Sequence, residues 1–301
     1  MRTLLERAVS RTTDIVVGKE REIRLALACL IARGHLLIED LPGVGKTALA
    51  HVLATVLGLK FNRIQFTSDL LPADIVGVSV FERDSGTFRF HPGPVFAQVI
   101  LADEINRATP KTQSALLEAM EEGQVTVDGA TRALPRPFFV IATQNPAHQT
   151  GTFPLPESQL DRFLMRLTLG YPGQAAERAL LKGGERRALI AALQPVLGAD
   201  DLLRIQGEVE TVHVAEAALD YLQALLEFSR SSAQYVTGLS PRAGLATLHA
   251  AKAWAYLAGR DHILPEDLQA VLPSVAGHRL RGNEHAAHEP VANLLSAVPV
   301  P

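Results

Sequence analysis

Short apolar runs alternate with helical patterns over the first part of the chain, up to about residue 170. Five of these runs end in polar or turn-forming residues: His35–Ile38, Phe61–Phe66, Val99–Ala102, Phe138–Ala142 and Phe163–Leu169. Near-continuous apolar strands that lie between helices are typical of a parallel sheet with both faces covered. We therefore expect an α/β domain built on a parallel sheet.

The pattern changes after Pro172, where the strand signal stops and helical periodicity takes over. The turn-prone tripeptide Tyr171–Gly173 marks the boundary and predicts two domains, residues 1–172 and residues 173–301. The second is expected to be smaller and all-helical, with helical patterns over Ala175–Leu193, Ala215–Ser231, Arg242–Leu257 and Glu266–Val271.

Two hairpins interrupt the first domain. Val78–Phe81 and Thr87–Phe90 flank a glycine-containing turn at Asp84–Gly86, and Gln124–Val127 runs into Asp128-Gly129. Both fall between helices rather than in the main sheet, so we expect them to project from the core, where they could reach a partner. The alternative is a pair of surface loops that fold back.

Charge and cysteine content narrow the class of protein. The 301 residues include 29 basic and 32 acidic side chains, which argues against nucleic acid or an anionic membrane as the main partner. Cys29 is the single cysteine, so no intramolecular disulfide and no Cys-x-x-Cys zinc site is expected. The seven-residue apolar stretch Ala26–Ala32 is far too short to span a membrane. We expect a cytoplasmic protein without a signal peptide or membrane insertion.

The glycine-rich segment Leu41–Thr47 follows the first predicted strand and precedes an apolar helix. Its backbone N–H groups would face a phosphate chain, with the helix N-terminus adding a positive dipole end. Lys46 would reach the β- and γ-phosphates, and the Thr47 hydroxyl would bind Mg²⁺. Asp40 stands where the first glycine of G-x-x-x-x-G-K-T is usual. The predicted phosphate-binding residues are Pro42, Gly43, Val44, Gly45, Lys46 and Thr47.

Polar residues also end two later strands. Asp103 and Glu104 follow Val99–Ala102, at the strand edge where open α/β sheets bind ligands. Asp103 would support the Mg²⁺ shell, and Glu104 would deprotonate the attacking water. A helix cap is the structural alternative for this acidic pair. Asn145 follows Phe138–Ala142 and could hold the same water, although asparagine before proline is also a common turn.

Several longer segments together resemble AAA+ ATPases, and more narrowly the MoxR family within the helix-2-insert branch. They are Phe66–Pro72, Leu101–Ala108, Thr109–Gln113, Leu116–Glu122 and Gly238–Ala243. The resemblance runs from about Val16 to Arg281. Two small departures are Asp40 and the pair Gly238-Leu239, where the family often has Gly-Ala. The resemblance implies a P-loop core followed by a helical lid domain, with ATP between them.

The resemblance also implies roles that spacing could not supply. Asn145 is similar to the sensor 1 residue that reads the γ-phosphate, and Arg242 to sensor 2, a lid arginine that reaches the same phosphate. Arg162 is the candidate arginine finger acting on a neighbouring subunit's nucleotide, with Arg166 as the reserve. A solvated or interface charge is the alternative for each arginine. Val17 and Gly18 fall in the segment that lines the adenine pocket in this family.

The activity that this resemblance implies is hydrolysis of ATP to ADP and phosphate, with ATP and Mg²⁺ bound, in a ring that would be a hexamer. The ring would remodel or mature a protein client beside a von Willebrand factor A-domain partner, with the two hairpins as the inserts that engage substrates. A nucleotide-dependent switch with little turnover and a nucleic-acid motor remain open. His285 and His288 have metal-ligand spacing, but no clear third ligand accompanies them, so no protein-ligated metal is expected.

Overall fold

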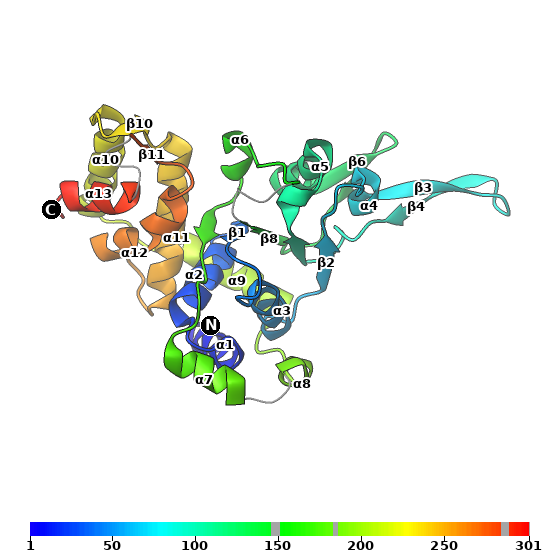
Figure 1. Cartoon of the computed structure of the whole chain (residues 1–301), viewed down its shortest axis with the longest axis horizontal. Helices are drawn as coiled ribbons and strands as arrows, with labels where there is room; N and C mark the ends of the chain where they lie inside the picture. The colour runs from blue at the N-terminus through cyan, green and yellow to red at the C-terminus, as the bar shows by residue number, and fades with distance from the viewer. Residues whose placement is uncertain (146–150, 183–185, 284–288, 301) are drawn as a thin grey trace.

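The central element is a parallel sheet of five strands (Figure 1). The computed structural model describes residues 1–145, 151–182, 186–283 and 289–300, so the histidine pair near residue 286 lies outside it. The strand order is β2-β5-β8-β1-β9, and every neighbouring pair is parallel. The strands are β1 (Leu36–Glu39), β2 (Phe61–Gln65), β5 (Val99–Asp103), β8 (Phe139–Gln144) and β9 (Met165–Leu167). The predicted α/β class and all five predicted strands are confirmed.

Alternate residues of the strands point into two separate apolar cores, because successive side chains of a strand face opposite sides of the sheet. Leu36 and Ile38 join the core beneath helices α1 (Arg2–Ile15), α2 (Glu20–Ile31) and α3 (Lys46–Val56). Leu37 lies in the other core, with Leu116 and Leu117 of α5 (Pro110–Glu122). The sheet is therefore buried on both faces, as its near-continuous apolar strands predict.

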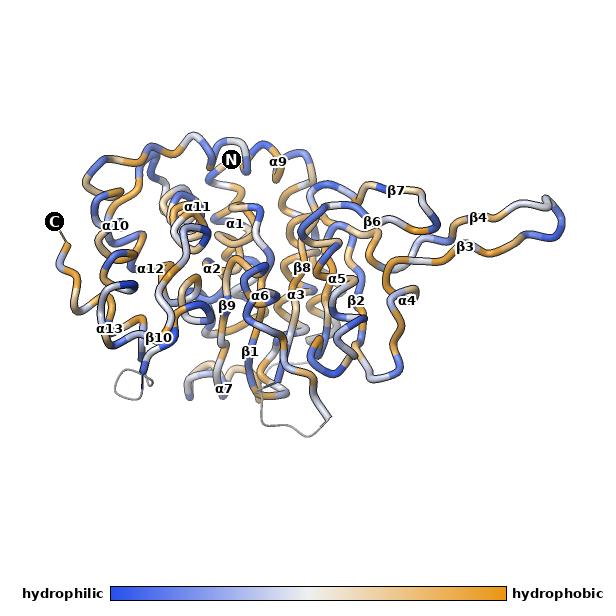
Figure 2. Tube along the Cα trace, turned by 90° about the horizontal axis from the view of Figure 1, so that it is seen from above, coloured by the Kyte–Doolittle hydropathy of each residue, from blue (hydrophilic) through white to orange (hydrophobic). Residues whose placement is uncertain are grey.

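Two antiparallel hairpins leave the domain on the side of β2 and α5 (Figures 1 and 2). The longer pairs β3 (Gly77–Glu82) with β4 (Thr87–Pro92) and extends well beyond the rest of the molecule. The shorter pairs β6 (Gln124–Val127) with β7 (Ala130–Ala133). Both match the sequence prediction. The short helix α4 (Pro72–Val76) leads into β3, and a 3₁₀ turn, Ile105–Arg107, follows β5.

Helices dominate the second part of the chain, as predicted, with differences at several positions. The helical pattern predicted over Ala175–Leu193 is present as two helices on either side of residues 183–185, which lie outside the described part. Two helices and the short β10–β11 ribbon were not predicted. The elements here are α7 (Gln174–Lys182), α8 (Arg186–Ala191), α9 (Ala199–Glu210), α10 (Glu216–Ser231), β10 (Tyr235–Thr237), α11 (Pro241–Leu257), α12 (Pro265–Ala276), β11 (Arg281–Gly282) and α13 (Pro290–Ala297). A short helix α6 (Glu157–Leu160) precedes β9.

The helical part packs directly on the N-terminal helices. Small residues of α11, among them Ala250 and Ala251, are fully buried in the same core as α2. Arg2 at the start of α1 donates to the carbonyls of Gly259 and Arg260 after α11. Helices α1 and α2 therefore pack against both the sheet and the helical second part of the chain.

Cys29 lies on α2, in the core that α2 shares with the sheet and α11. Its side chain is fully buried, and burial raises the pKa of its thiol well above the usual value. The thiol therefore behaves as a small apolar core group. Among the described residues, no helix combines the length and apolar character that a membrane span requires.

Candidate active site

The glycine-rich loop lies between β1 and α3, with Gly45 directly before the first residue of the helix. Gly43 and Gly45 have φ angles of 87° and 99°, a region that side chains rarely adopt. An added Cβ at either glycine would meet no atom within 4 Å, so the backbone is open to an approaching ligand. Thr47 is exposed beside it. This geometry fits the predicted phosphate loop.

Asp40 has a structural role where the usual loop has glycine. Its buried carboxylate accepts hydrogen bonds from the backbone N–H of Leu41 at 2.7 Å and of Gly170 at 2.6 Å. Two backbone donors and the nearby ammonium of Lys46 compensate for the buried charge. Asp40 therefore joins the start of the loop to the segment after β9.

Lys46 reaches across the loop to the neighbouring strands. The side chain is only 8% exposed, and its ammonium donates to the Asp40 carbonyl and to Oδ1 of Asn145 at 3.1 Å. Burial lowers the pKa of Lys46, while the carboxylates of Asp103 and Glu104 act in the opposite direction. The Lys46 ammonium therefore lies at the end of β8, where its third N–H could donate to a phosphate oxygen.

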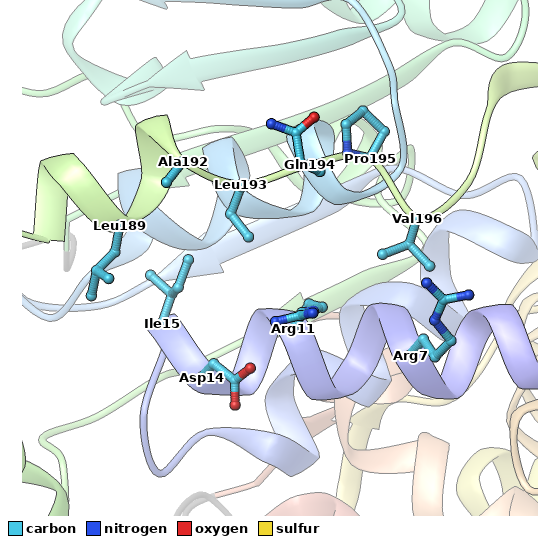
Figure 3. Close-up of a pocket in the computed structure, with 10 residues that line it drawn as sticks. All are labelled: Arg7, Arg11, Asp14, Ile15, Leu189, Ala192, Leu193, Gln194, Pro195 and Val196. Carbon is cyan, nitrogen blue, oxygen red and sulfur yellow. The ribbon is translucent and has the colours of Figure 1, made fainter.

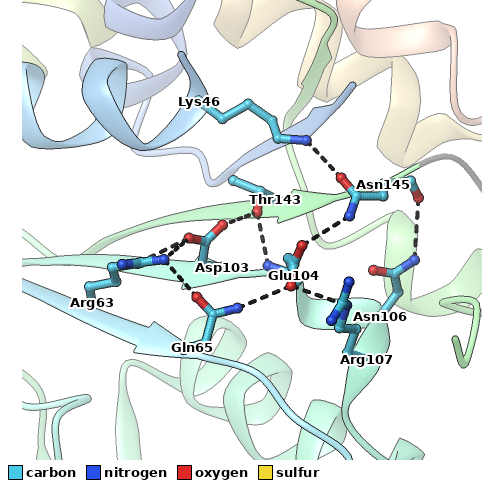
Figure 4. Close-up of polar contacts among 9 residues, drawn as sticks. All are labelled: Lys46, Arg63, Gln65, Asp103, Glu104, Asn106, Arg107, Thr143 and Asn145. Carbon is cyan, nitrogen blue, oxygen red and sulfur yellow. Dashed lines mark hydrogen bonds and ion pairs between the residues drawn. The ribbon is translucent and has the colours of Figure 1, made fainter. Parts of the chain in front are cut away.

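Asp103 is the last residue of β5 and Glu104 follows it, and Figure 4 shows the two side chains facing different groups. Oδ2 of Asp103 accepts from Arg63 at 2.6 Å, and its Oδ1 accepts from the Thr143 hydroxyl at 2.6 Å. The same hydroxyl accepts the backbone N–H of Glu104 at 2.9 Å. Thr143 of β8 therefore fixes the backbone at the point where the two carboxylates diverge.

Glu104 turns toward Asn145 because its backbone has a left-handed conformation, with φ 58°. Its Oε1 accepts from the Asn145 amide at 3.0 Å, which continues the contact from Lys46 (Figure 4). Its Oε2 accepts from Gln65 at 3.1 Å and pairs with Arg107 at 3.1 Å. Lysine, amide and carboxylate thus form one row from the loop to the end of β5.

An open cavity of about 330 Å³ lies beside the loop. Val17, Gly43 and Gly45 line it together with Tyr171 and Pro172, while the exposed Leu181 of α7 closes one wall. Gly18 is not among the lining residues but packs closely on α7, since an added Cβ would lie 2.8 Å from Ala176. A heterocycle fits a site of this apolar character beside a phosphate loop.

A second cavity, of about 410 Å³, lies beside α1 (Figure 3). Arg7 and Arg11 of α1 face the segment that holds Gln194, Pro195 and Val196. Ile15 at the end of α1 lines both this cavity and the one beside the loop. No residue with a predicted chemical role lines this second cavity.

The candidate arginines lie in two groups. Arg162 and Arg242 both pair with Glu121, at 2.9 Å and 3.8 Å. Arg166 pairs instead with Glu39 at 3.0 Å and donates to the Gly277 carbonyl at 2.6 Å. Arg242 and Arg162 therefore lie close together, and Arg166 lies apart from them. Of the predicted site residues, Lys46 and Asn145 contact each other at the phosphate loop instead.

At this site, the protein side chains alone would not fill the coordination sphere of Mg²⁺. No group of three or more His, Cys, Asp or Glu side chains that could hold a metal is present in the described residues. Thr47 offers an exposed hydroxyl, while both oxygens of Asp103 already have protein partners. Phosphate and water would therefore supply most of the ligands, with Asp103 in the outer shell.

Three residues of the site were missed by sequence reasoning: Arg63, Gln65 and Thr143. Gln65 lies directly opposite Asp103 in the pairing of β2 with β5. That pairing, and the placement of β8 beside β5, would have revealed these side chains. Neither follows from the local pattern of apolar residues.

Comparison with known proteins defines the class. Residues 35–165 match the ATPase family associated with various cellular activities (AAA), and residues 227–297 match the AAA lid domain. A crystal structure assigned to an ATPase from Cytophaga hutchinsonii superposes with a TM-score of 0.89 at 35% identity, covering 100% of this chain and 96% of that one. The fold is that of a AAA+ ATPase, with a lid domain after the nucleotide-binding family domain.

Relatives of known sequence narrow the class further. The chain is 45% identical to the uncharacterized protein YeaC of Bacillus subtilis, over 99% of this chain and 95% of that protein. It is 40% identical to Chaperone MoxR1 of Mycobacterium tuberculosis, over 92% of this chain and 75% of that protein. The chain therefore belongs to the MoxR family of AAA+ ATPases.

Proposed function

We propose that this chain binds ATP with Mg²⁺ and hydrolyses it to ADP and phosphate at the ends of β5 and β8. One observation carries the proposal: Lys46, Asn145 and Glu104 form an uninterrupted row of hydrogen bonds beside an open phosphate loop. A structural helix cap would not need an amide that donates to its carboxylate and accepts from a buried lysine. A hydrolytic site needs all three.

Each residue has a distinct task in this reaction. The nucleoside would occupy the cavity bordered by Val17 and Tyr171, with its phosphates on the N–H groups of residues 43–47. Glu104 would take the proton from the attacking water, and Asn145 would orient that water against the γ-phosphate. Mg²⁺ would neutralise phosphate charge, held by Thr47 and, through water, by Asp103.

We further propose that Arg162 acts on the nucleotide of an adjoining subunit. For Arg242, which the sequence resemblance assigns to the phosphate that Asn145 reads, we propose instead that it acts on that adjoining nucleotide together with Arg162. Their shared partner Glu121 supports this, because it keeps both guanidinium groups at one place. In the described residues, neither arginine has an ion pair or hydrogen bond to the phosphate loop of its own chain. A site completed by a second chain requires an oligomer, and a hexameric ring is the proposed form.

The work of the ring is proposed to be remodelling or maturation of a protein client in the cytoplasm, beside a von Willebrand factor A-domain partner. The name Chaperone MoxR1 of a 40% identical relative supports a chaperone-like role. The projecting β3–β4 hairpin supports a contact with a client, since Phe81 and Phe88 are exposed on it. We also propose the domain division at residues 172 and 173, beside the nucleotide cavity.

The test is ATP hydrolysis per subunit as protein concentration rises, with Arg162→Ala measured alongside. A shared site predicts specific activity that climbs with concentration and a loss of about 10³-fold or more in the variant. A rate that is independent of concentration and unchanged in the variant would contradict the shared site. Negligible hydrolysis at every concentration would favour a nucleotide switch, and a salt-sensitive rise on adding DNA would favour a nucleic-acid motor.

A further inference from the structure

A chain of alternating charges connects the two candidate arginines. Arg162 Nη2 lies 2.9 Å from Oε2 of Glu121, and Arg242 Nη1 lies 3.8 Å from Oε1 of the same carboxylate. One glutamate thus holds one guanidinium group on each oxygen. Two like charges repel at such separations unless an anion lies between them.

The far end of this charge chain is buried. Arg242 Nε lies 3.5 Å from Asp161, which in turn pairs with Arg279 at 2.6 Å. The Arg279 side chain is only 7% exposed and also donates to the carbonyls of Asp161 and Phe163. Asp161 therefore has a fixed position, and three guanidinium groups share two carboxylates. The surplus positive charge is available to an anion that approaches Arg162 and Arg242.

Glu121 is also held in place by its own element. It is the second-last residue of α5, and the carbonyl of the preceding Met120 accepts a hydrogen bond from His35 at 3.2 Å. The other ring nitrogen of His35 accepts the backbone N–H of Val140 at 3.0 Å. Burial lowers the pKa of His35 to about 4, so the ring stays neutral and keeps both bonds. The end of α5 is thereby fastened to the sheet.

We propose that Glu121 is a positioning residue that holds Arg162 and Arg242 as a pair facing the γ-phosphate of ATP on the adjoining subunit. The inference rests on the proposed shared site and adds the group that orders it. Arg162 comes from the segment before β9 and Arg242 from the first turn of α11. Asp161, the residue before Arg162, also pairs with Arg242, but the Glu121 carboxylate on α5 contacts both guanidinium groups. Because α5 runs directly into the β6–β7 hairpin, the same residue joins the arginine pair to that hairpin.

The first experiment measures kcat and KM for ATP in Glu121→Gln. The amide keeps the shape of the side chain but removes the charge that both arginines share. Misplaced catalytic groups cost about 10- to 100-fold in kcat, while KM should stay within about twofold because another chain's loop binds the ATP. The matched control is Glu122→Gln, since Glu122 is exposed and has no ion pair in the part of the chain that is described. Unchanged or increased kcat in Glu121→Gln, with Arg162→Ala inactive, would overturn the proposal.

The second experiment mixes inactive variants. Lys46→Ala subunits lack their own ATP site but supply arginines, and Arg162→Ala subunits keep their ATP site, so a mixture should regain activity. The recovery should fall about 10-fold or more when the donor carries both Lys46→Ala and Glu121→Gln. Equal recovery with both donors would overturn the role of Glu121. No recovery with either donor would instead overturn the shared site on which the inference rests.

Discussion

Lys46 is a charged residue of the site that is almost completely buried. Its ammonium makes contacts with both the loop and Asn145. We predict that Lys46→Ala weakens ATP binding by about 10- to 100-fold, since a hydrogen bond to a charged group contributes about 1.5–3 kcal/mol and each step of about 1.4 kcal/mol is tenfold in affinity. Titration with a fluorescent ATP analogue measures this loss. Lys60→Ala is the control because Lys60 is exposed just before β2, and tight ATP retention by Lys46→Ala would contradict the assignment.

Glu104 should separate binding from turnover. Its carboxylate receives the Asn145 amide, and an amide in place of that carboxylate could still occupy the same space. We expect Glu104→Gln to bind ATP normally while kcat falls about 10²- to 10⁴-fold, because general-base catalysis contributes that much. Equilibrium binding and steady-state hydrolysis on the same preparation test both parts. An unimpaired rate would mean that another group activates the water.

Part of the candidate site could be predicted from the sequence, namely those residues whose role follows from the residues next to them in the chain. Lys46 follows a glycine-rich turn, and Asp103 ends an apolar run, so both could be placed from the sequence. Glu121 and Arg63 could not. Their partners come from distant segments, and the contacts depend on strand order and on where α5 ends. Such contacts follow from tertiary packing and leave no periodic signal.

The same distinction applies to whole elements. The inner strands β1, β5 and β8 were predictable because both of their faces are buried, which makes each one an apolar run up to its polar end. The helix α9 has buried apolar residues at helical spacing, yet Gly207 near its end lowers the intrinsic helix propensity. The two residues of β11 are too few to show alternation. Packing against the rest of the molecule stabilises such elements.

The first turn of α11 is an element end that carries a candidate catalytic group. Ser240 caps this helix, accepting the backbone N–H of Ala243 at 3.1 Å, and Arg242 lies between them. We predict that Ser240→Ala lowers the free energy of unfolding by about 1 kcal/mol. Denaturant unfolding measures it, with Ser231→Ala on the exposed end of α10 as the control. Equal stability of the two variants would show that the cap contributes nothing.

Stability of the whole molecule should depend on pH through two buried histidines. Burial lowers the pKa of His35 to about 4 and of His278 to about 3, with Arg279 and Arg166 adding to the effect at His278. The unfolded chain binds protons near pH 6.5 that the folded chain does not, so stability falls as pH drops below that value. Each histidine contributes a slope of up to about 1.4 kcal/mol per pH unit.

Thermal unfolding between pH 6.5 and 5 measures this slope. His278→Asn should reduce it by up to about 1.4 kcal/mol per pH unit, because one of the two buried titrating rings is removed. His249→Asn, at an exposed position of α11, serves as the comparison. A slope that is the same in all three proteins would show that His278 does not contribute to the acid response.

The buried thiol of Cys29 has a practical consequence for watching this molecule work. It is the single cysteine of the chain, and its position inside the core keeps maleimide dyes away from it. The native chain can therefore serve as a background without reactive thiols. The substitution Ser85→Cys, at an exposed position in the turn between β3 and β4, would introduce one labelling site on the projecting hairpin, away from the phosphate loop. A fluorophore there would report each movement of the hairpin optically, without any core residue being replaced first.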